Sequence, residues 1–377
     1  MKNIWVFAKR ESVLIIAAGL AILSAFFVPP NEGYLAYIDF YVLGILFCLM
    51  IVVAGLMKSG VFEYISARLL RRFRSPKAII CILVHCVFFS SMFVTNDVAL
   101  ILFVPLTIGL FGMGAGSAGP MRGKLIHVIV LETLAANLGS MLTPIGNPQN
   151  LYIYSFYTMD IMDFFAIVLP IGALGYGVIL CLTLLPKGSG APPDAAGEPP
   201  VLTGKKSLIL YYAALFALCI LTVVRVLEYT MCVLLVLAGT LLIDRSLLKK
   251  VDYALLLTFF AFFIFVGNIG RIEAIQTLLS DVLAHRVFLT GVVSSQLISN
   301  VPAAMLIAQF TNDARDVLLG VNVGGQGTLI ASLASLISFK FYAKSEGARP
   351  MRYLGIFTLY NIGVLIVLIG FWYFAYR

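Results

Sequence analysis

The chain contains eight apolar segments, most of them close to the length that a helix needs to cross lipid. A helix requires about 20 residues to span the hydrocarbon core of a bilayer. Of the 377 residues, 61% are hydrophobic and 12% are charged, whereas soluble domains are roughly half apolar and a quarter charged. The sequence therefore predicts an all-α, multi-pass membrane protein with the lipid bilayer as a partner. The segments are 13–28, 40–56, 78–93, 164–185, 208–224, 231–243, 253–266 and 355–374.

The distribution of Lys and Arg predicts how these segments are oriented. Cytoplasmic loops of membrane proteins carry an excess of both residues. With the N-terminus on the cytoplasmic side, most of the 26 Lys and Arg residues lie inside, and the C-terminus lies outside. The net charge of +8 then reflects topology, so we expect no nucleic-acid partner. We expect the first segment to remain as a span rather than to be cleaved as a signal peptide. The basic residues expected outside are Arg225, Arg271, Arg286, Arg315 and Arg377.

Four long segments are interrupted near their middle by polar residues, Gly or Pro. Residues 78–113 are too long for one straight span and carry "TND", so they predict a re-entrant hairpin. Residues 287–310, which carry "SNV", predict a second hairpin. Residues 124–158 and 317–341 contain "TPIGNPQN" and "VGGQGT" and predict broken helices, because irregular backbone at membrane depth must be surrounded by protein or water. We expect about nine full spans plus the two hairpins.

Three patterns occur twice in the same order along the chain. "SSMFVTN" from Ser90 recurs as "SSQLISN" from Ser294, "NLGSMLTPIG" recurs as "NVGGQGTLIA", and "IDFY" recurs as "VDYA". We therefore expect a first repeat at 1–186, a cytoplasmic linker at 187–206 and a second repeat at 207–377. The charge distribution places the hairpins on opposite faces, so the repeats are predicted to be inverted. Inverted repeats with broken helices are typical of secondary transporters.

The hairpin tips are the predicted substrate site. Asn96 is expected to cap a helix that starts at Asp97, and Asn300 to cap a helix that starts at Val301. Each helix would then direct its positive N-terminal end at the middle of the membrane, where free N–H groups can hold an anion. Capping alone is the simpler interpretation. The predicted substrate-binding residues are Thr95, Asn96, Thr143, Asn147, Ser299, Asn300 and Thr328.

The broken helices and two carboxylates are the predicted site of a coupling ion. Unwound backbone carbonyls can coordinate Na⁺, and an ionisable residue inside the membrane is a functional candidate by default. The simpler alternatives are that Asp97 only favours a helix N-terminus and that Glu132 is a hydrogen-bonded structural carboxyl. No cofactor or metal beyond a possible Na⁺ is expected. The predicted coupling-ion residues are Ser90, Asp97, Glu132, Asn137, Gly146, Asn322 and Gly324.

Other classes of membrane protein fit the sequence less well. A channel needs a continuous polar pore, and the apolar segments lack recurring polar stripes. An enzyme needs a nucleophile–base pair or a metal cluster, and the sequence contains neither in a recognisable pattern, so no catalytic residue is expected. An ATP-driven pump would require a phosphate-binding GxxxxGK[ST] loop, which is absent from the sequence.

The repeated motifs resemble those of the ion-transporter superfamily that includes arsenite permeases, sodium–proton antiporters and divalent-anion:sodium symporters. The likeness covers nearly the whole chain, and it is carried by "NLGSMLTPIGNPQNLYI", "SQLISNVPAAMLI" and "VNVGGQGTLIASLASLI". The chain is similar to a short branch of bacterial inner-membrane permeases. The resemblance implies a scaffold domain and a transport domain, an elevator-like movement, location in the inner membrane and often a homodimer.

The tips also carry the difference between the branches of that superfamily. The symporters use Ser-Asn-Thr at both tips for carboxylate and Na⁺ contacts, and residues 95–96 and 299–300 match the first two positions. The third positions, Asp97 and Val301, depart from that pattern. Arsenite permeases and antiporters usually show Asp-Asn, with the acid at the position of Thr95. The predicted function is ion-coupled transport of a small anion, using Na⁺ or H⁺, with metalloid efflux and then Na⁺/H⁺ exchange as alternatives.

Overall fold

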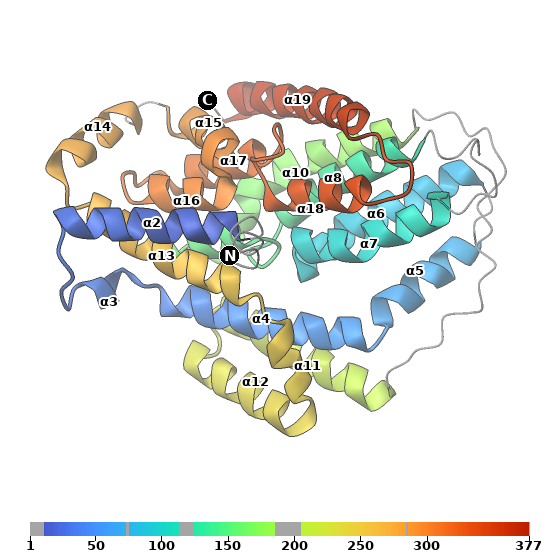
Figure 1. Cartoon of the computed structure of the whole chain (residues 1–377), viewed down its shortest axis with the longest axis horizontal. Helices are drawn as coiled ribbons and strands as arrows, with labels where there is room; N and C mark the ends of the chain where they lie inside the picture. Colours follow the sequence, from blue (N-terminus) through green and yellow to red (C-terminus); the bar gives the residue numbers. More distant parts are fainter. Residues whose placement is uncertain (1–10, 73–74, 113–123, 185–204, 284–285, 377) are drawn as a thin grey trace, which may run out of the picture.

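The computed structural model describes residues 11–72, 75–112, 124–184, 205–283 and 286–376. Within these residues every regular element is a helix, which confirms the all-α prediction (Figure 1). The predicted linker lies outside the described residues except for its last two positions. Residues 1–10 and Arg377 also lie outside them, so the sides of the two chain ends stay predictions.

The first half of the chain forms nine helices within the described residues. Asp39 starts α4 by accepting a hydrogen bond from the Val42 amide at 2.9 Å, and Pro76 and Pro148 stand in the first turns of α6 and α9, where proline costs no backbone bond. The helices are α2 (Ser12–Phe27), α3 (Tyr34–Tyr37), α4 (Phe40–Lys58), α5 (Val61–Arg72), α6 (Pro76–Val94), α7 (Asn96–Gly112), α8 (Leu125–Ser140), α9 (Pro148–Phe156) and α10 (Ile161–Leu184).

The second half of the chain forms ten helical elements within the described residues. Asp252 starts α13 as Asp39 starts α4, by accepting a hydrogen bond from the Leu255 amide at 3.0 Å. The elements are α11 (Lys206–Val223), α12 (Tyr229–Ile243), the 3-10 helix η2 (Arg245–Lys250), α13 (Tyr253–Ile269), α14 (Glu273–Leu283), α15 (Val287–Ile298), α16 (Asn300–Ala308), α17 (Ala314–Gly324), α18 (Leu333–Ala343) and α19 (Pro350–Ala375).

Five described helices are long and apolar enough to cross a membrane: α4, α6, α10, α11 and α19. A sixth results if α13 and α14, which are bent by 98° at their junction, are taken as one span. Several other apolar helices, including α2 and α12, are shorter, so the total of about nine spans stays a prediction. The surface is apolar, as contact with lipid requires, with Leu242 and Phe374 exposed by 85% and 88%.

The two helix pairs at the predicted hairpins have matching surroundings. Helices α6 and α7 are separated by Thr95 alone and lie against each other, and so do α15 and α16 around Ser299. Helix α6 packs on α8, and α15 packs on α17. The second helix of each pair packs on the other half of the chain, with α7 on α18 and α16 on α9. The centre of the molecule is therefore built from both halves.

Glycine permits the closest of these helix contacts. A Cβ atom on Gly139 of α8 would collide with the backbone oxygen of Phe88 in α6. A Cβ atom on Gly324 of α17 would lie 2.8 Å from the Oγ of Ser295 in α15. Both glycines hold the third position of the repeated "NLG" and "NVG" motifs. The repeat thus preserves a close helix approach in each half.

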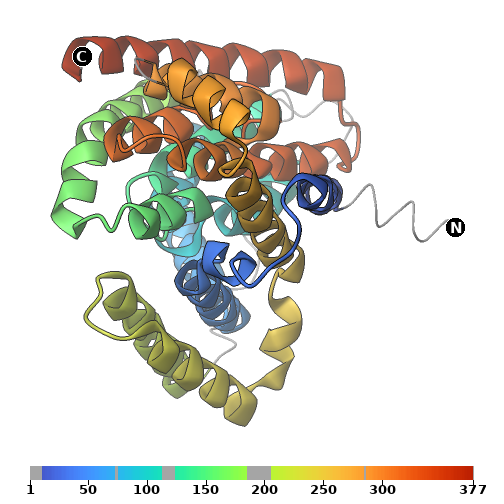
Figure 2. The same cartoon turned by 90° about the vertical axis from the view of Figure 1, so that its left-hand side faces the viewer.

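A second group of helices flanks this centre. Helix α4 packs on α11 and α12, while α2 packs on α13. Both views place α11 and α12 at the opposite side of the molecule from α19 (Figure 2). Helix α14 was not predicted from the sequence.

Candidate functional site

The two hairpin tips have the same unusual backbone conformation. Thr95 has φ 74° and ψ 154°, and Ser299 has φ 73° and ψ 154°. A positive φ is strained for residues with a side chain, and most of all for a β-branched residue such as threonine. Each tip is held by one backbone bond, from Asn96 N to Gly146 O at 3.2 Å and from Asn300 N to Ala331 O at 3.0 Å. These acceptors occupy matching positions of the repeated motif.

The predicted helix starts are displaced by one residue. Helices α7 and α16 begin at Asn96 and Asn300 themselves, and no side-chain hydrogen bond caps α16. The Asn96 Oδ1 accepts from the Asp97 amide at 3.0 Å, while its Nδ2 donates to Asn137 Oδ1 at 3.1 Å. Asn96 is therefore bound to the neighbouring broken helix as well as to its own first turn. A Cβ on Gly325 would lie 3.0 Å from the Asn300 Nδ2.

Asn137 of α8 links the first tip to the broken helix of the second half. Its Oδ1 also accepts from Ser332 Oγ at 3.1 Å. Its Nδ2 donates to Gly325 O and to Ser335 Oγ, both at 3.4 Å. The side chain is buried, so these bonds replace the water that it loses on folding.

Asn322 of α17 holds the matching position in the second half and bonds to the first. Its Oδ1 accepts from Asn147 Nδ2 at 3.2 Å, and its Nδ2 donates to Asn150 Oδ1 at 2.6 Å. Asn147 also caps α9, because its own Oδ1 accepts from the Asn150 amide at 2.9 Å. Each of the two motif asparagines therefore reaches the break in the other half. Four of the predicted site residues, Asn96, Asn137, Asn147 and Asn322, are joined in this way.

The two predicted threonines are bound to backbone rather than to the asparagines. Thr143 Oγ1 donates to Met92 O at 2.5 Å, and Thr328 Oγ1 donates to Gln296 O at 3.4 Å. These carbonyls lie at equivalent positions in the last turns of α6 and α15. The contacts fasten each break to the end of the helix before the tip. Their predicted role in substrate binding stays a prediction.

The two carboxylate side chains form no hydrogen bond to these asparagines within the described residues. Glu132 is fully buried in α8, where its Oε1 accepts from Thr107 Oγ1, and its Oε2 has no hydrogen-bond partner among the described residues. Asp97 stands in the first turn of α7, and its buried Oδ1 likewise lacks a partner in the described part of the chain. Neither of these oxygens therefore has a hydrogen-bond partner in the described part of the chain.

The remaining predicted residues are placed in different ways. Gly146 and Gly324 have their carbonyl oxygens at the breaks. The Gly146 oxygen accepts a hydrogen bond from Asn96 N, and the Gly324 oxygen accepts one from Gln296 Nε2 at 2.6 Å. Ser90 lies elsewhere, on an apolar cavity of about 320 Å³ beside Phe89 and Phe93. Its neighbour Ser91 is the serine that is buried at the close approach to Gly139.

Several polar residues at the site were absent from the predicted set. Ser332 and Ser335 bind Asn137, and Gln326 is fully buried with neither amide atom bonded to any described residue. Gln326 occupies the position that matches Met141 in the first half. A polar residue inside a glycine run was the available signal for Gln326. Ser332 and Ser335 carried no such sequence signal, because they contact Asn137, which is distant in sequence.

The family comparison decides the class of the protein. The family model described as CitMHS, citrate transporter, matches residues 4–317. The chain belongs to the CitMHS citrate transporter family. Membership makes it a membrane transporter, which confirms that class and the relation to the ion-transporter superfamily, and it agrees with the expectation of a protein that is not an enzyme.

Two relatives of this family member match almost its full length, and a third matches half of it. The inner membrane protein YbiR of Escherichia coli is 32% identical over 95% of the chain and 93% of the relative. An uncharacterized transporter of Methanocaldococcus jannaschii is 30% identical over 95% of the chain and 96% of the relative. A silicon efflux transporter of Oryza sativa is 27% identical over 50% of the chain and 37% of the relative.

Proposed function

We propose that this transporter is a secondary active carrier that couples Na⁺ or H⁺ to the movement of a small anion across the inner membrane. The observation that carries the proposal is the pair of hairpin tips. Both have the same strained backbone, both are fixed to the break of a neighbouring helix, and both start a helix at the buried polar centre. The positive ends of two helices at one place favour an anionic cargo.

The proposal includes two inverted repeats, 1–186 and 207–377, that build one site between them. It is supported by equivalent contacts at Thr95 and Ser299, at Asn137 and Asn322, and at Thr143 and Thr328. The exchange of partners between halves, with α7 on α18 and α16 on α9, supports it further. In such transporters the cargo lies at the repeat interface near the middle of the membrane.

The cargo is bound by neutral groups and helix ends in this proposal. The substrate-binding residues are those predicted from the sequence, and Gln326 is added because its buried amide has no bonded partner among the described residues. A co-bound cation compensates the charge of the anion. Asp97 and Glu132 supply carboxylate oxygens for Na⁺ or a proton, and the carbonyls at Gly146 and Gly324 stand near the breaks.

Alternating access would follow from an elevator-like movement. The helices around the tips, α6–α10 and α15–α19, would move against α2, α4 and α11–α13. The separate packing of α4 on α11 and α12 and of α2 on α13 supports this division. A homodimer held through the second group would keep that group still while the first moves.

Efflux of a neutral hydroxylated metalloid acid is the second candidate. The rice relative is named a silicon efflux transporter. The groups around Asn137 and Asn322 are amides, hydroxyls and backbone carbonyls, and these can bind a neutral polyhydroxylated molecule as well as an anion. Such a cargo would need no compensating cation.

Transport by purified protein in liposomes tests the proposal. Labelled citrate, succinate, sulfate, phosphate and silicic acid are offered under an imposed Na⁺ gradient, an imposed pH gradient or neither. Accumulation of one anion above equilibrium only with a gradient is the expected result. Equilibration of an anion at a rate that ignores both gradients would refute coupling, and gradient-driven movement of silicic acid alone would establish the second candidate.

A further inference from the structure

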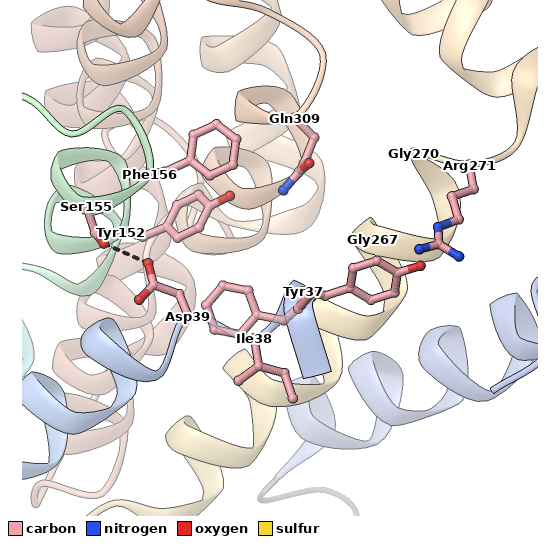
Figure 3. A pocket seen from close by; sticks show the side chains of 12 residues that line it. Tyr37, Ile38, Asp39, Tyr152, Ser155, Phe156, Gly267, Gly270, Arg271 and Gln309 are labelled. Atoms are coloured by element: carbon pink, nitrogen blue, oxygen red, sulfur yellow. Dashed lines mark hydrogen bonds between the residues drawn. The ribbon is translucent and has the colours of Figure 1, made fainter. Parts of the chain in front are cut away.

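A second cavity lies away from the asparagine centre, between the two groups of helices. It has a volume of about 560 Å³, within the range of small-molecule sites. Its walls come from the α3–α4 junction, the ends of α9 and α16, and the region where α13 ends (Figure 3). The polar side chains that line it are Tyr37, Asp39, Tyr152, Ser155, Arg271 and Gln309.

The distance from the centre separates this cavity from the site at the tips. Helices α9 and α16 both begin at the polar centre and both contain nine residues. At 1.5 Å per residue each extends roughly 13 Å, and the cavity lies at their far ends. There the Tyr157 hydroxyl, which follows α9, donates to Thr311 O at 2.8 Å, just beyond α16.

Arg271 is the cationic side chain of the cavity. Its guanidinium carbon lies 5.2 Å from the centre of the Tyr37 ring, which orients the group by a cation–π contact. The guanidinium itself forms no ion pair or hydrogen bond with any described residue. A guanidinium offers five N–H donors in a planar fork that matches a carboxylate or a similar oxyanion.

The corresponding cation of the first half is neutralised. Lys58 and Arg271 each stand 19 residues after the Asp that starts their helix, Asp39 and Asp252. Lys58 Nζ lies 2.6 Å from Asp244 Oδ2 and 3.0 Å from Ser246 Oγ. The two halves therefore carry a cation at equivalent positions, Lys58 and Arg271. Among the described residues a carboxylate pairs with Lys58 but none pairs with Arg271.

Two tyrosine hydroxyls complete the set of donors. The hydroxyls of Tyr37 and Tyr152 are buried, the Tyr37 hydroxyl makes no hydrogen bond to any described residue, and the Tyr152 hydroxyl lies within reach of the Gln309 side chain alone. Figure 3 shows the Tyr152 hydroxyl on the side of Gln309 and the Tyr37 ring extending toward Arg271. Both oxygens of Asp39 are already occupied, by the Val42 amide at 2.9 Å and by Ser155 Oγ at 2.7 Å, which weakens its repulsion of an anion.

We infer that this cavity is a capture site for a small carboxylate or similar oxyanion, distinct from the transport site at the tips. Arg271 binds the anion through its fork, and the hydroxyls of Tyr37 and Tyr152 donate to the remaining oxygens. The inference rests on the proposed function, because it takes the cargo to be a small anion. Capture next to the ends of α9 and α16 raises the local concentration of cargo and leaves the chemistry of the centre unchanged.

The test compares Arg271→Gln with Lys58→Gln, a matched loss of cation at the equivalent position. Transport of succinate and of sulfate by the full chain in liposomes is measured over a range of concentrations. Arg271→Gln is expected to raise KM about tenfold with Vmax within about twofold, as for loss of one charge-assisted bond. Arg271→Lys should recover part of the loss, Tyr152→Phe should raise KM less, and Lys58→Gln should match wild type.

The outcomes separate this inference from the proposed function. Wild-type transport with an unchanged KM in Arg271→Gln would overturn the capture site and leave the proposed function standing. Absence of anion transport by the wild type would overturn the proposed function itself. Asn322→Ala, which alters the centre, should lower Vmax. Succinate binding to the purified Asn322→Ala chain, measured by calorimetry, should persist. It should disappear in the double variant that also carries Arg271→Gln. Size-exclusion profiles verify that each variant is folded.

Discussion

The side-chain nitrogen Nδ2 of Asn96 lies 3.1 Å from the side-chain oxygen Oδ1 of Asn137, so the first residue of α7 is bonded to α8 at the polar centre. Asn137 is bonded in turn to Ser332 and Ser335 of the other half. This chain of hydrogen bonds connects the first tip to the second broken helix. This physical connection is the basis for the first expected result.

Asn137→Ala should impair both stability and transport. The substitution removes a buried acceptor and donor, and each buried polar group that loses its partner costs about 1–3 kcal/mol. We expect a lower thermal midpoint of the purified protein and a strong loss of uptake. Asn361→Ala is the control, because Asn361 is also buried, but among the described residues its Nδ2 bonds within α19 alone, to Phe357 O at 2.9 Å. Equal loss of uptake in both variants would contradict a special role of Asn137.

Gly139→Ala should destabilise the protein through overpacking. The added Cβ atom would collide with the Phe88 oxygen and the Ser91 hydroxyl, and forced separation of packed groups costs about 1–3 kcal/mol. Gly109→Ala in α7 is the matched control, since nothing lies within 4 Å of its added Cβ. That control should be neutral or slightly stabilising, by up to about 1 kcal/mol. Chemical unfolding in detergent measures both, and a tolerated Gly139→Ala would refute the close approach.

Asp97→Asn should uncouple transport from the ion gradient while the protein stays folded. The substitution keeps the size of the side chain and removes the charge that the coupling ion would contact. Uptake should lose its dependence on the imposed Na⁺ or pH gradient. Asp163→Asn is the matched control, because Asp163 also stands in the first turn of an apolar helix, α10, but is exposed. Full gradient dependence in Asp97→Asn would remove Asp97 from the mechanism.

Gln326→Met should separate binding from stability. The buried amide of Gln326 makes no hydrogen bond to described residues, and Met is the residue at the matching position, Met141. Because burial of an unpaired amide is unfavourable by about 1–3 kcal/mol, the variant should be as stable as wild type or more stable. Uptake should fall if the amide binds cargo. A stable variant with unaltered uptake would show that Gln326 does not contact the cargo.

The pair of Lys58 and Asp244 should make a small, pH-dependent contribution to stability. The hydrogen bond from the Lys58 ammonium, followed by that from the Ser246 hydroxyl, lowers the pKa of the Asp244 carboxyl below its usual value. A lowered pKa in the folded state means that the stabilisation is present above the unfolded pKa and is lost as pH falls through the folded pKa. Exposed pairs contribute less than about 1 kcal/mol, so the effect should be modest.

Thermal midpoints of wild type and Asp244→Asn at pH 7 and pH 3 examine this contribution. The difference between the two proteins should be larger at pH 7 and should shrink as the pH falls toward 3, through the lowered pKa of Asp244. High salt should reduce it as well, because the pair is solvent-exposed. A difference that grows on acidification would contradict the assigned sign.

Local sequence was sufficient to locate most of the elements. Asp39 and Asp252 start helices by capping their own first turns, and Pro148 marks the helix after the first break, so these features depend on residues a few positions apart. The interruptions at Thr95 and Ser299 were visible as polar residues within apolar segments. Helix α14 and the start of α16 at Asn300 were missed, because helix ends depend on tertiary contacts such as the bond from Asn300 N to Ala331 O.

The sequence by itself determined that the chain is a helical membrane protein with paired polar interruptions, because apolar length, Gly, Pro and charge distribution act locally. Tertiary structure alone decided which polar residues meet. Hydrogen bonds join Asn137 to Ser332 and Asn322 to Asn150. The hydroxyls of Thr143 and Thr328 are bonded to backbone carbonyls. Ser90 lines an apolar cavity. These partners lie in different parts of the chain, and only the packing of helices from both halves determines which atoms come within hydrogen-bond distance.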